Sequence, residues 1–247
     1  MRSKLTIVTI VVALVLAALK VLYDFVRWLG VVPGLLLGAG IATTVLTAYR
    51  LAIQPWQHRW GATDDEVARP MPGDEVIPEA SSTTRAITIR ARPEQIWPWL
   101  VQIGFGRAGW YSYDWIDNDG HRSADEILAE HQHLAVGDQI LMVPGMGPRV
   151  RAIDEPRFLL CGDAEGGTWC LGLYPDGEHR TRLVSRWRVD WPLTPASAFW
   201  ILLSDPGAFI MERRMLLGIR ERAERTAATG SDGRAGTDAR PKRVRGR

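Results

Sequence analysis

Two long apolar runs occupy the N-terminal part of the chain. Leu5–Leu19 contains no charged residue, and Trp28–Tyr49 contains none either, has an aromatic residue at each end and precedes Arg50. A helix rises about 1.5 Å per residue, so the second run is long enough to cross a bilayer. The first is roughly 22 Å long and crosses only if it continues past Lys20 to about Phe25. We therefore expect a membrane anchor in residues 1–55, with two spans at about 5–25 and 28–49.

Small residues recur every four positions along both runs. Gly30, Gly34 and Gly38 do so in the second run, and Ala13 and Ala17 do so in the first. Such stripes allow helix backbones to approach closely, so the two spans are expected to pack as a transmembrane helical hairpin. The alternative use of the stripe is self-association of two chains through the Gly30/Gly34/Gly38 face.

Basic residues flank the anchor at both outer ends. Arg2 and Lys4 precede it and Arg50 follows it, whereas Lys20 and Arg27 lie towards the connection. The positive-inside rule then places both ends of a multi-pass anchor, and the soluble domain, in the cytoplasm. In the alternative interpretation residues 1–18 are a cleaved signal peptide and one span remains, although no Ala-x-Ala motif precedes a cleavage point.

Residues 56–82 are expected to form a juxtamembrane connector. Trp56 and Trp60 flank His58 and Arg59, a mixture that suits the headgroup layer of a membrane. Residues 64–82 are rich in Pro, Gly and acidic residues and show no periodicity, which indicates an extended segment.

The pattern of residues 83–228 predicts one α+β domain. Residues 83–90 alternate like a strand, and Pro93 opens a helix that reaches about Ile103. Ser123 and Glu126 match a capping box at the start of another helix. Short β-type runs separated by turn residues follow, as in an antiparallel sheet. These runs lie at 139–143, 150–153, 157–161, 168–174 and 181–191.

A long helix is expected to close the domain, with Asp205-Pro206 as its start and Thr226 near its end. Its apolar side carries Phe209, Leu216, Ile219 and Ala223. In the last strand one face is the expected wall of a pocket, formed by Leu183, Ser185, Trp187 and Val189. The other face, with Arg182, Arg186 and Arg188, is expected to face solvent, and contact with an anionic headgroup is the alternative. Residues 229–247 are expected to be a disordered basic tail.

Composition and motifs exclude several classes of function. The formal net charge of +2 is too small to indicate a nucleic-acid partner. No nucleotide-binding or serine-hydrolase fingerprint is present, and the histidines between His121 and His133 lack the spacing of a zinc site, so no cofactor or metal is expected. Cys161 and Cys170 flank a turn and are expected to face each other across a hairpin as buried thiols, with a disulfide left open.

Three motifs resemble a bacterial branch of the SRPBCC superfamily, the START and Bet v1-like helix-grip group. They are the aromatic block Gly109–Trp115, the preceding Pro93–Leu100 and the later Leu134–Asp138. The resemblance implies a sheet of about seven antiparallel strands wrapped round the C-terminal helix and enclosing a hydrophobic pocket. The superfamily includes lipid carriers, hormone receptors and polyketide cyclases, so it does not select a reaction, and no catalytic set is transferred.

The aromatic block supplies the remaining candidate residues. Tyr111, Tyr113 and Asp114 are suited to orient a polar ligand group or to act as acid and base, or else they satisfy nearby backbone groups while Trp110 and Trp115 fill core volume. Together with the strand residues, the ligand-binding candidates are Trp110, Tyr111, Tyr113, Asp114, Trp115, Leu183, Ser185, Trp187 and Val189.

Three functions are compatible with these patterns. The first is a membrane-tethered domain that binds a hydrophobic or lipid-like small molecule, without catalysis. The second is a polyketide cyclase- or dehydratase-like enzyme acting on a hydrophobic substrate. The third is an interaction module that works through its anchor or basic tail.

Overall fold

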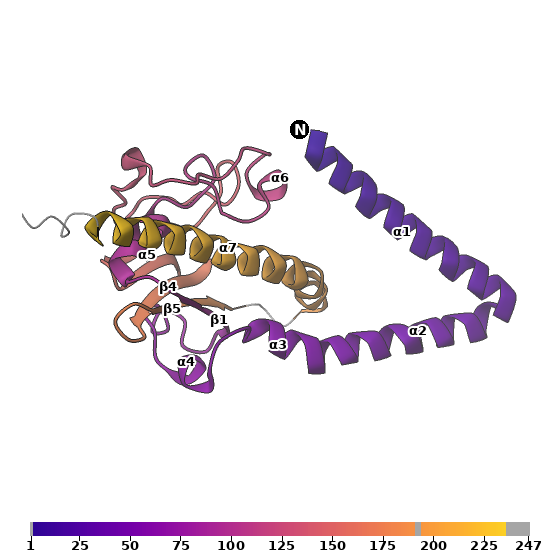
Figure 1. Cartoon of the computed structure of the whole chain (residues 1–247). Helices are drawn as coiled ribbons and strands as arrows, with labels where there is room; N and C mark the ends of the chain where they lie inside the picture. Colours follow the sequence, from indigo (N-terminus) through magenta and orange to yellow (C-terminus); the bar gives the residue numbers. More distant parts are fainter. Residues whose placement is uncertain (1, 191–193, 236–247) are drawn as a thin grey trace, which may run out of the picture.

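The computed structural model describes residues 2–190 and 194–235, and it consists of two long N-terminal helices and a folded α+β domain (Figure 1). Helix α1, Arg2–Leu29, and helix α2, Val31–Ala48, are joined by Gly30 at φ 90°. They touch near this joint, where a Cβ on Gly34 would lie 2.8 Å from the Cα of Val26. Figure 1 shows that they then diverge towards the domain.

Val31–His58 is the one helical stretch, within the part of the chain that is described, whose length and mean hydropathy of 1.8 suit a membrane span. It comprises α2, a π-helical turn at Tyr49–Ile53 and helix α3, Gln54–His58. The expectation of two spans is therefore not confirmed. In α1 the apolar run is interrupted by Lys20, which forms an ion pair of 2.5 Å with Asp24.

Five antiparallel strands form a single sheet in the order β1-β5-β4-β3-β2. Its strands are β1 Ser81–Ile89, β2 Val150–Asp154, β3 Phe158–Asp163, β4 Gly167–Pro175 and β5 Thr181–Val189. The seven or so strands implied by the resemblance are not all present among the described residues. The expected strand at 139–143 forms only isolated bridges, Gln139 to Arg149 and Val143 to Met146. Pro144 and Pro148 lack the N–H groups that a continuous ladder requires.

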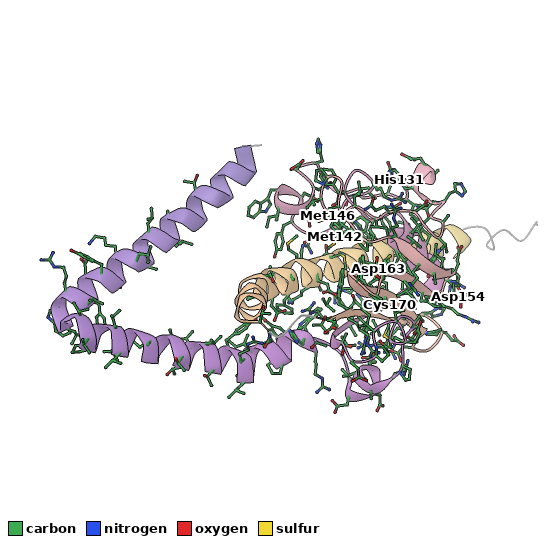
Figure 2. The ribbon with its side chains drawn as sticks, turned by 180° about the vertical axis from the view of Figure 1, so that it is seen from behind. His131, Met142, Met146, Asp154, Asp163 and Cys170 are labelled. Atoms are coloured by element: carbon green, nitrogen blue, oxygen red, sulfur yellow. The ribbon has the colours of Figure 1, made fainter. Side chains whose placement is uncertain are left out.

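The main core lies between the inner face of the sheet and two helices, α5 at Pro93–Val101 and α7 at Pro195–Ala235. As predicted, α5 begins at Pro93, and Leu216, Ile219 and Ala223 of α7 are completely buried. Figure 2 shows the space between the sheet and α7 filled by side chains.

Helix α7 is longer than expected at both ends. Asp205-Pro206 does not start it, because Pro206 lies inside the helix, and its C-terminal end is Ala235 rather than Thr226. Proline inside a helix removes one backbone hydrogen bond and bends the axis, and the first turns of α7 run in a different direction from the rest in Figure 1. The remainder of the expected tail, residues 236–247, lies outside the described residues.

The outer face of the sheet is covered by residues 61–80, which we call the strap. The strap contains helix α4, Asp64–Ala68, and its Met71 packs with Leu160, Cys170 and Val184. The expectation that the arginines of β5 face solvent is therefore wrong. Their guanidinium groups bind carboxylates and backbone carbonyls of the strap, so burial is compensated by hydrogen bonds.

Residues 102–149 form loops with two short helices, α6 at Asp114–Asp117 and a 3-10 turn, η2, at Ala129–His131. The helix expected to start at Ser123 is absent from this described region. The hydroxyl of Ser123 instead donates to the Asp114 carboxylate and accepts from the Tyr111 N–H, so it closes a loop rather than capping a helix.

The two cysteines lie on adjacent strands but on opposite faces of the sheet. Cys170 is paired in register with Leu160, and Cys161 with Trp169. Cys161 belongs to the main core, whereas Cys170 packs beneath the strap. The expectation that they face each other is wrong. The residue opposite Cys161 is Trp169, one position before Cys170, and successive side chains of a strand point to opposite faces of the sheet.

Burial raises the pKa of both thiols to about 12, which leads to a chemical prediction. Only about one thiol in ten thousand is ionised at pH 8 with such a pKa, and the thiolate is the reactive form. A disulfide-exchange reagent such as Ellman's reagent should therefore modify both cysteines only after unfolding. Rapid modification of either thiol in the native protein would contradict this burial.

Candidate functional site

Three tryptophans form a continuous row across the inner face of the sheet. Trp169 on β4 stacks on Trp187 of β5, with ring centroids 5.0 Å apart and planes at 10°. Trp110, from the aromatic block, extends the row, since its ring centroid lies 5.9 Å from that of Trp169. Trp110 and Trp169 are buried and Trp187 is half-buried, so the row runs from the core towards its edge.

A chain of buried polar groups adjoins this row. The indole N–H of Trp169 donates to the Ser185 hydroxyl at 2.9 Å, and Ser185 donates to the Glu212 carboxylate of α7 at 2.6 Å. The other oxygen of Glu212 pairs with Arg85 of β1, whose Nε donates to the backbone carbonyl of Gln57 at 2.9 Å. Polar groups converging on an apolar interior are the usual means of orienting a small ligand.

The structure brings together only part of the predicted set of site residues. Trp110, Ser185 and Trp187 meet around Trp169, and Leu183 lies deeper in the same core. Trp115 is 50% exposed on α6. The remaining predicted residues, Tyr113, Asp114 and Val189, are half-buried, while Tyr111 is buried.

The side chain of Tyr111 is held by contacts within the domain. Its hydroxyl accepts from Gln102 at 2.8 Å and donates to the carbonyl of Trp99 at 3.3 Å, and its ring lies 4.5 Å from the guanidinium carbon of Arg222. Burial raises the pKa of this phenol further above its ordinary value, so it remains protonated at neutral pH. Asp114 is likewise engaged, since it accepts from both the N–H and the hydroxyl of Ser123.

Sequence patterns did not single out Glu212 or Arg85. Glu212 lies in the predicted long helix, where an acidic residue is usually exposed, and Arg85 lies in an alternating strand. Their side chains are only 9% and 3% exposed. The one available signal was that Arg85 shares the strand face of Ile87 and Ile89, which placed a charge on the buried face.

Asp117 of α6 is a second buried acid that sequence patterns missed. Neither carboxyl oxygen has a partner with hydrogen-bond geometry among the described residues. Burial, and then the nearby charge of Asp114, raise the pKa of Asp117 from 3.8 to about 6. Ser112 offsets only part of this rise, and its hydroxyl donates to the carbonyl of Met211 at 3.0 Å.

The raised pKa of Asp117 predicts a pH-dependent effect of Asp117→Asn. Because the pKa is higher in the folded than in the unfolded protein, the carboxyl destabilises the fold once the pH rises above the unfolded value near 3.8. The variant should therefore gain stability relative to wild type as the pH is raised from about 4 to about 7. Thermal unfolding across this range measures the difference, and a difference that is constant with pH would contradict the burial of this charge.

A separate polar cluster joins the end of the Val31–His58 helix to α7. The carboxylate of Asp205 accepts from Gln54 at 2.9 Å and contacts His58 at 2.8 Å and the Tyr49 hydroxyl at 3.2 Å. Burial alone would raise the pKa of Asp205, but the hydrogen bonds from His58 and Gln54 outweigh it and lower the pKa. The domain is thus fixed to the end of the Val31–His58 helix, close to the Trp row.

Comparisons with known proteins find structural neighbours only. No family model and no curated protein match the chain. Neighbours among solved structures include polyketide cyclase-like and related α+β proteins. The self-sacrificing resistance protein CalC from Micromonospora echinospora is 12% identical, with 60% of this chain and 97% of that chain covered and a TM-score of 0.35.

Two further neighbours have similar values. The polyketide cyclase-like protein Cgl2372 from Corynebacterium glutamicum is 16% identical over 67% of this chain and 100% of that chain, with a TM-score of 0.28. Norcoclaurine synthase from Thalictrum flavum is 14% identical over 58% of this chain and 96% of that chain, with a TM-score of 0.29. At these values the similarity does not transfer an activity, and function has to be argued from the chain's own residues.

Proposed function

We propose that this protein is a membrane-tethered binding protein for a hydrophobic or lipid-like small molecule. The observation that carries the proposal is the Trp110–Trp169–Trp187 row, which ends on the buried Ser185, Glu212 and Arg85. The row offers flat apolar surfaces, and in this proposal a ligand enters beside its half-buried member, Trp187.

The polar chain gives such a ligand a preferred orientation. A carbonyl or hydroxyl group of the ligand would approach Ser185 and Arg85, whereas its apolar part would displace core contacts beside the tryptophan rings. The indole N–H of Trp110, which is buried and has no hydrogen-bond partner among the described residues, is a further donor for a polar ligand group.

Binding is tested on the full-length protein extracted in mild detergent, by native mass spectrometry and analysis of the released molecules. The wild type should carry a co-purifying apolar compound, and Trp187→Arg should abolish its retention. Val136→Arg, which introduces the same charge at a side chain that is 65% exposed, is the control and should retain the compound. Failure to detect any compound in the wild type, or equal retention in both variants, would overturn the proposal.

The anchor keeps this binding domain beside the bilayer. We propose that α2 spans the membrane, that α1 accompanies it as a second span, and that both ends and the domain are cytoplasmic. Figure 1 is compatible with this arrangement, because the start of α1 and the end of α2 both lie near the domain. Arg27 of α1 lies three residues before the joint, and the paired Lys20 and Asp24 lie ten and six residues before it, from where the long lysine side chain reaches towards the interface.

Anchoring is tested by alkaline extraction of membranes. The wild type should stay with the membrane, whereas Leu36→Arg combined with Ile41→Arg should become extractable, because each arginine costs roughly 2.5–3.5 kcal/mol in the centre of a span. Both positions are exposed on α2, so the exchange leaves the folded domain intact. Extraction of the wild type would exclude the span.

The enzyme alternative has less support. Its candidate acids and bases are Tyr111, Tyr113 and Asp114, and two of them are engaged within the protein. Tyr111 bonds to Gln102 and Trp99, and Asp114 accepts from Ser123.

A further inference from the structure

An apolar groove of about 990 Å³ lies between α1, α2 and the bend of α7. Ala17 and Val21 line it from α1, Gly38 and Ala42 line it from α2, and Pro206 of α7 borders its domain end. Apart from Tyr49, whose ring lies at that end, every lining side chain is apolar.

The groove exists because the two helices touch only near their joint. Gly34 is buried against Val26, but from there the helices diverge, as Figure 1 shows, and the small residues that follow leave the widening space unfilled. The small-residue stripe thus brings the backbones together at one position and forms a hollow at the others. Because Gly34 is occupied within the chain, self-association through it would first have to break this contact.

We propose that the groove is a binding site for one acyl chain of a bilayer phospholipid. A dry hollow of this size is unfavourable beside lipid, since its walls lack contact partners on one side. Water does not fill it favourably either, because the walls offer almost no hydrogen-bond partners. A flexible hydrocarbon chain matches the apolar composition of the groove and can adapt to the widening space between the two helices.

The orientation of the lipid follows from the ends of the groove. The joint of α1 and α2 is the closed end, and the opposite end lies at Tyr49, directly before Arg50. The chain terminus therefore lies towards Gly34, and the headgroup lies at the level of Arg50 and the domain. This site is distinct from the Trp row, and the inference rests on the membrane anchoring of α1 and α2 rather than on the interior ligand.

The chain provides a matched pair of variants. Gly38 lines the groove, whereas Gly40, in the same helix, has no atom within 4 Å of the position of an added Cβ. Gly38→Leu fills the groove, and Gly40→Leu adds the same side chain to the outer surface. Both exchanges favour the helix, so neither should unfold it. Ala42→Leu is a second variant that fills the groove.

The test uses full-length protein in nanodiscs of phosphatidylcholine, followed by detergent exchange and native mass spectrometry. Wild type and Gly40→Leu should retain one phosphatidylcholine per chain, and retention should fall about tenfold or more in Gly38→Leu and Ala42→Leu. Equal retention in all four proteins, or no retained lipid in the wild type, would overturn the proposal.

Trp187→Arg separates this site from the interior site. Phosphatidylcholine that survives in Trp187→Arg but is lost in Gly38→Leu supports the groove, whatever the fate of the interior ligand. Loss in Trp187→Arg together with retention in Gly38→Leu assigns the lipid to the interior and overturns the groove proposal, while the proposed binding function stands.

Discussion

Replacing Glu212 with alanine is expected to reduce the free energy of unfolding by about 3–5 kcal/mol, because it leaves a buried charge without its partner. The guanidinium of Arg85 is 3% exposed and Glu212 is its carboxylate partner. The Ser185 hydroxyl loses its acceptor in the same variant. Chemical denaturation of the domain measures the effect.

The neighbouring Glu221 is the matched control. It lies on the same helix and pairs with Arg214 at 2.9 Å, but both side chains are well exposed, so Glu221→Ala should cost less than about 1 kcal/mol. The double variant Arg85→Met/Glu212→Leu should recover much of the loss, since an apolar pair of similar volume needs no partner. Equal stability of Glu212→Ala and Glu221→Ala would show that the buried pair is not formed.

Arg186→Ala is the second exchange with a large expected effect, and it acts on the opposite face of the sheet. Arg186 is 4% exposed and pairs with Asp74 at 2.7 Å. It also donates to the strap carbonyls of Glu66, Val67 and Arg69. Its removal leaves these acceptors buried without a donor, which should cost about 3–5 kcal/mol.

The location of this loss can be measured as well as its size. Because Arg186 connects β5 to the strap, limited proteolysis of Arg186→Ala should cleave first within residues 61–80. The exposed Arg180, at the end of the β4–β5 turn, provides the control: Arg180→Ala should leave both stability and the cleavage pattern unchanged. A uniform loss of protection over the whole domain would contradict the role assigned to Arg186.

The sequence predicted the elements with a clear period and missed the contacts between distant segments. Alternation in β5 correctly separated Leu183 and Ser185 from the arginines, and the helical period of α7 correctly identified Leu216, Ile219 and Ala223. What covers the arginine face could not be predicted, because the strap has no period. The strap binds the arginine side chains mainly through its backbone carbonyls. Every sequence has these groups, so they leave no pattern from which the contact could be predicted.

Local capping signals were less reliable than periodicity for a related reason. Ser123 and Asp205 both have side chains that often cap helices, but each hydrogen-bonds to a segment elsewhere in the chain. Of the candidate site, sequence predicted Trp110, Ser185 and Trp187. It missed Trp169 and Glu212, which join them, because their meeting depends on strand order and on the rotation of α7.

The continuous helix from α2 through α3 sets how the domain is turned relative to the apolar stretch Val31–His58. Its end is fixed to α7 by Asp205, so the domain does not swing on a loose linker. Each residue of a helix advances the direction of its side chain by about 100°. Inserting a single residue into α2 before Tyr49 would therefore turn the whole domain by about 100° around the axis of this helix while shifting it along that axis by only about 1.5 Å. The length of this helix therefore fixes the rotation of the domain about the helix axis much more strongly than its position along that axis. The π-helical turn at Tyr49–Ile53 lies between α2 and α3, where the helix reaches the domain.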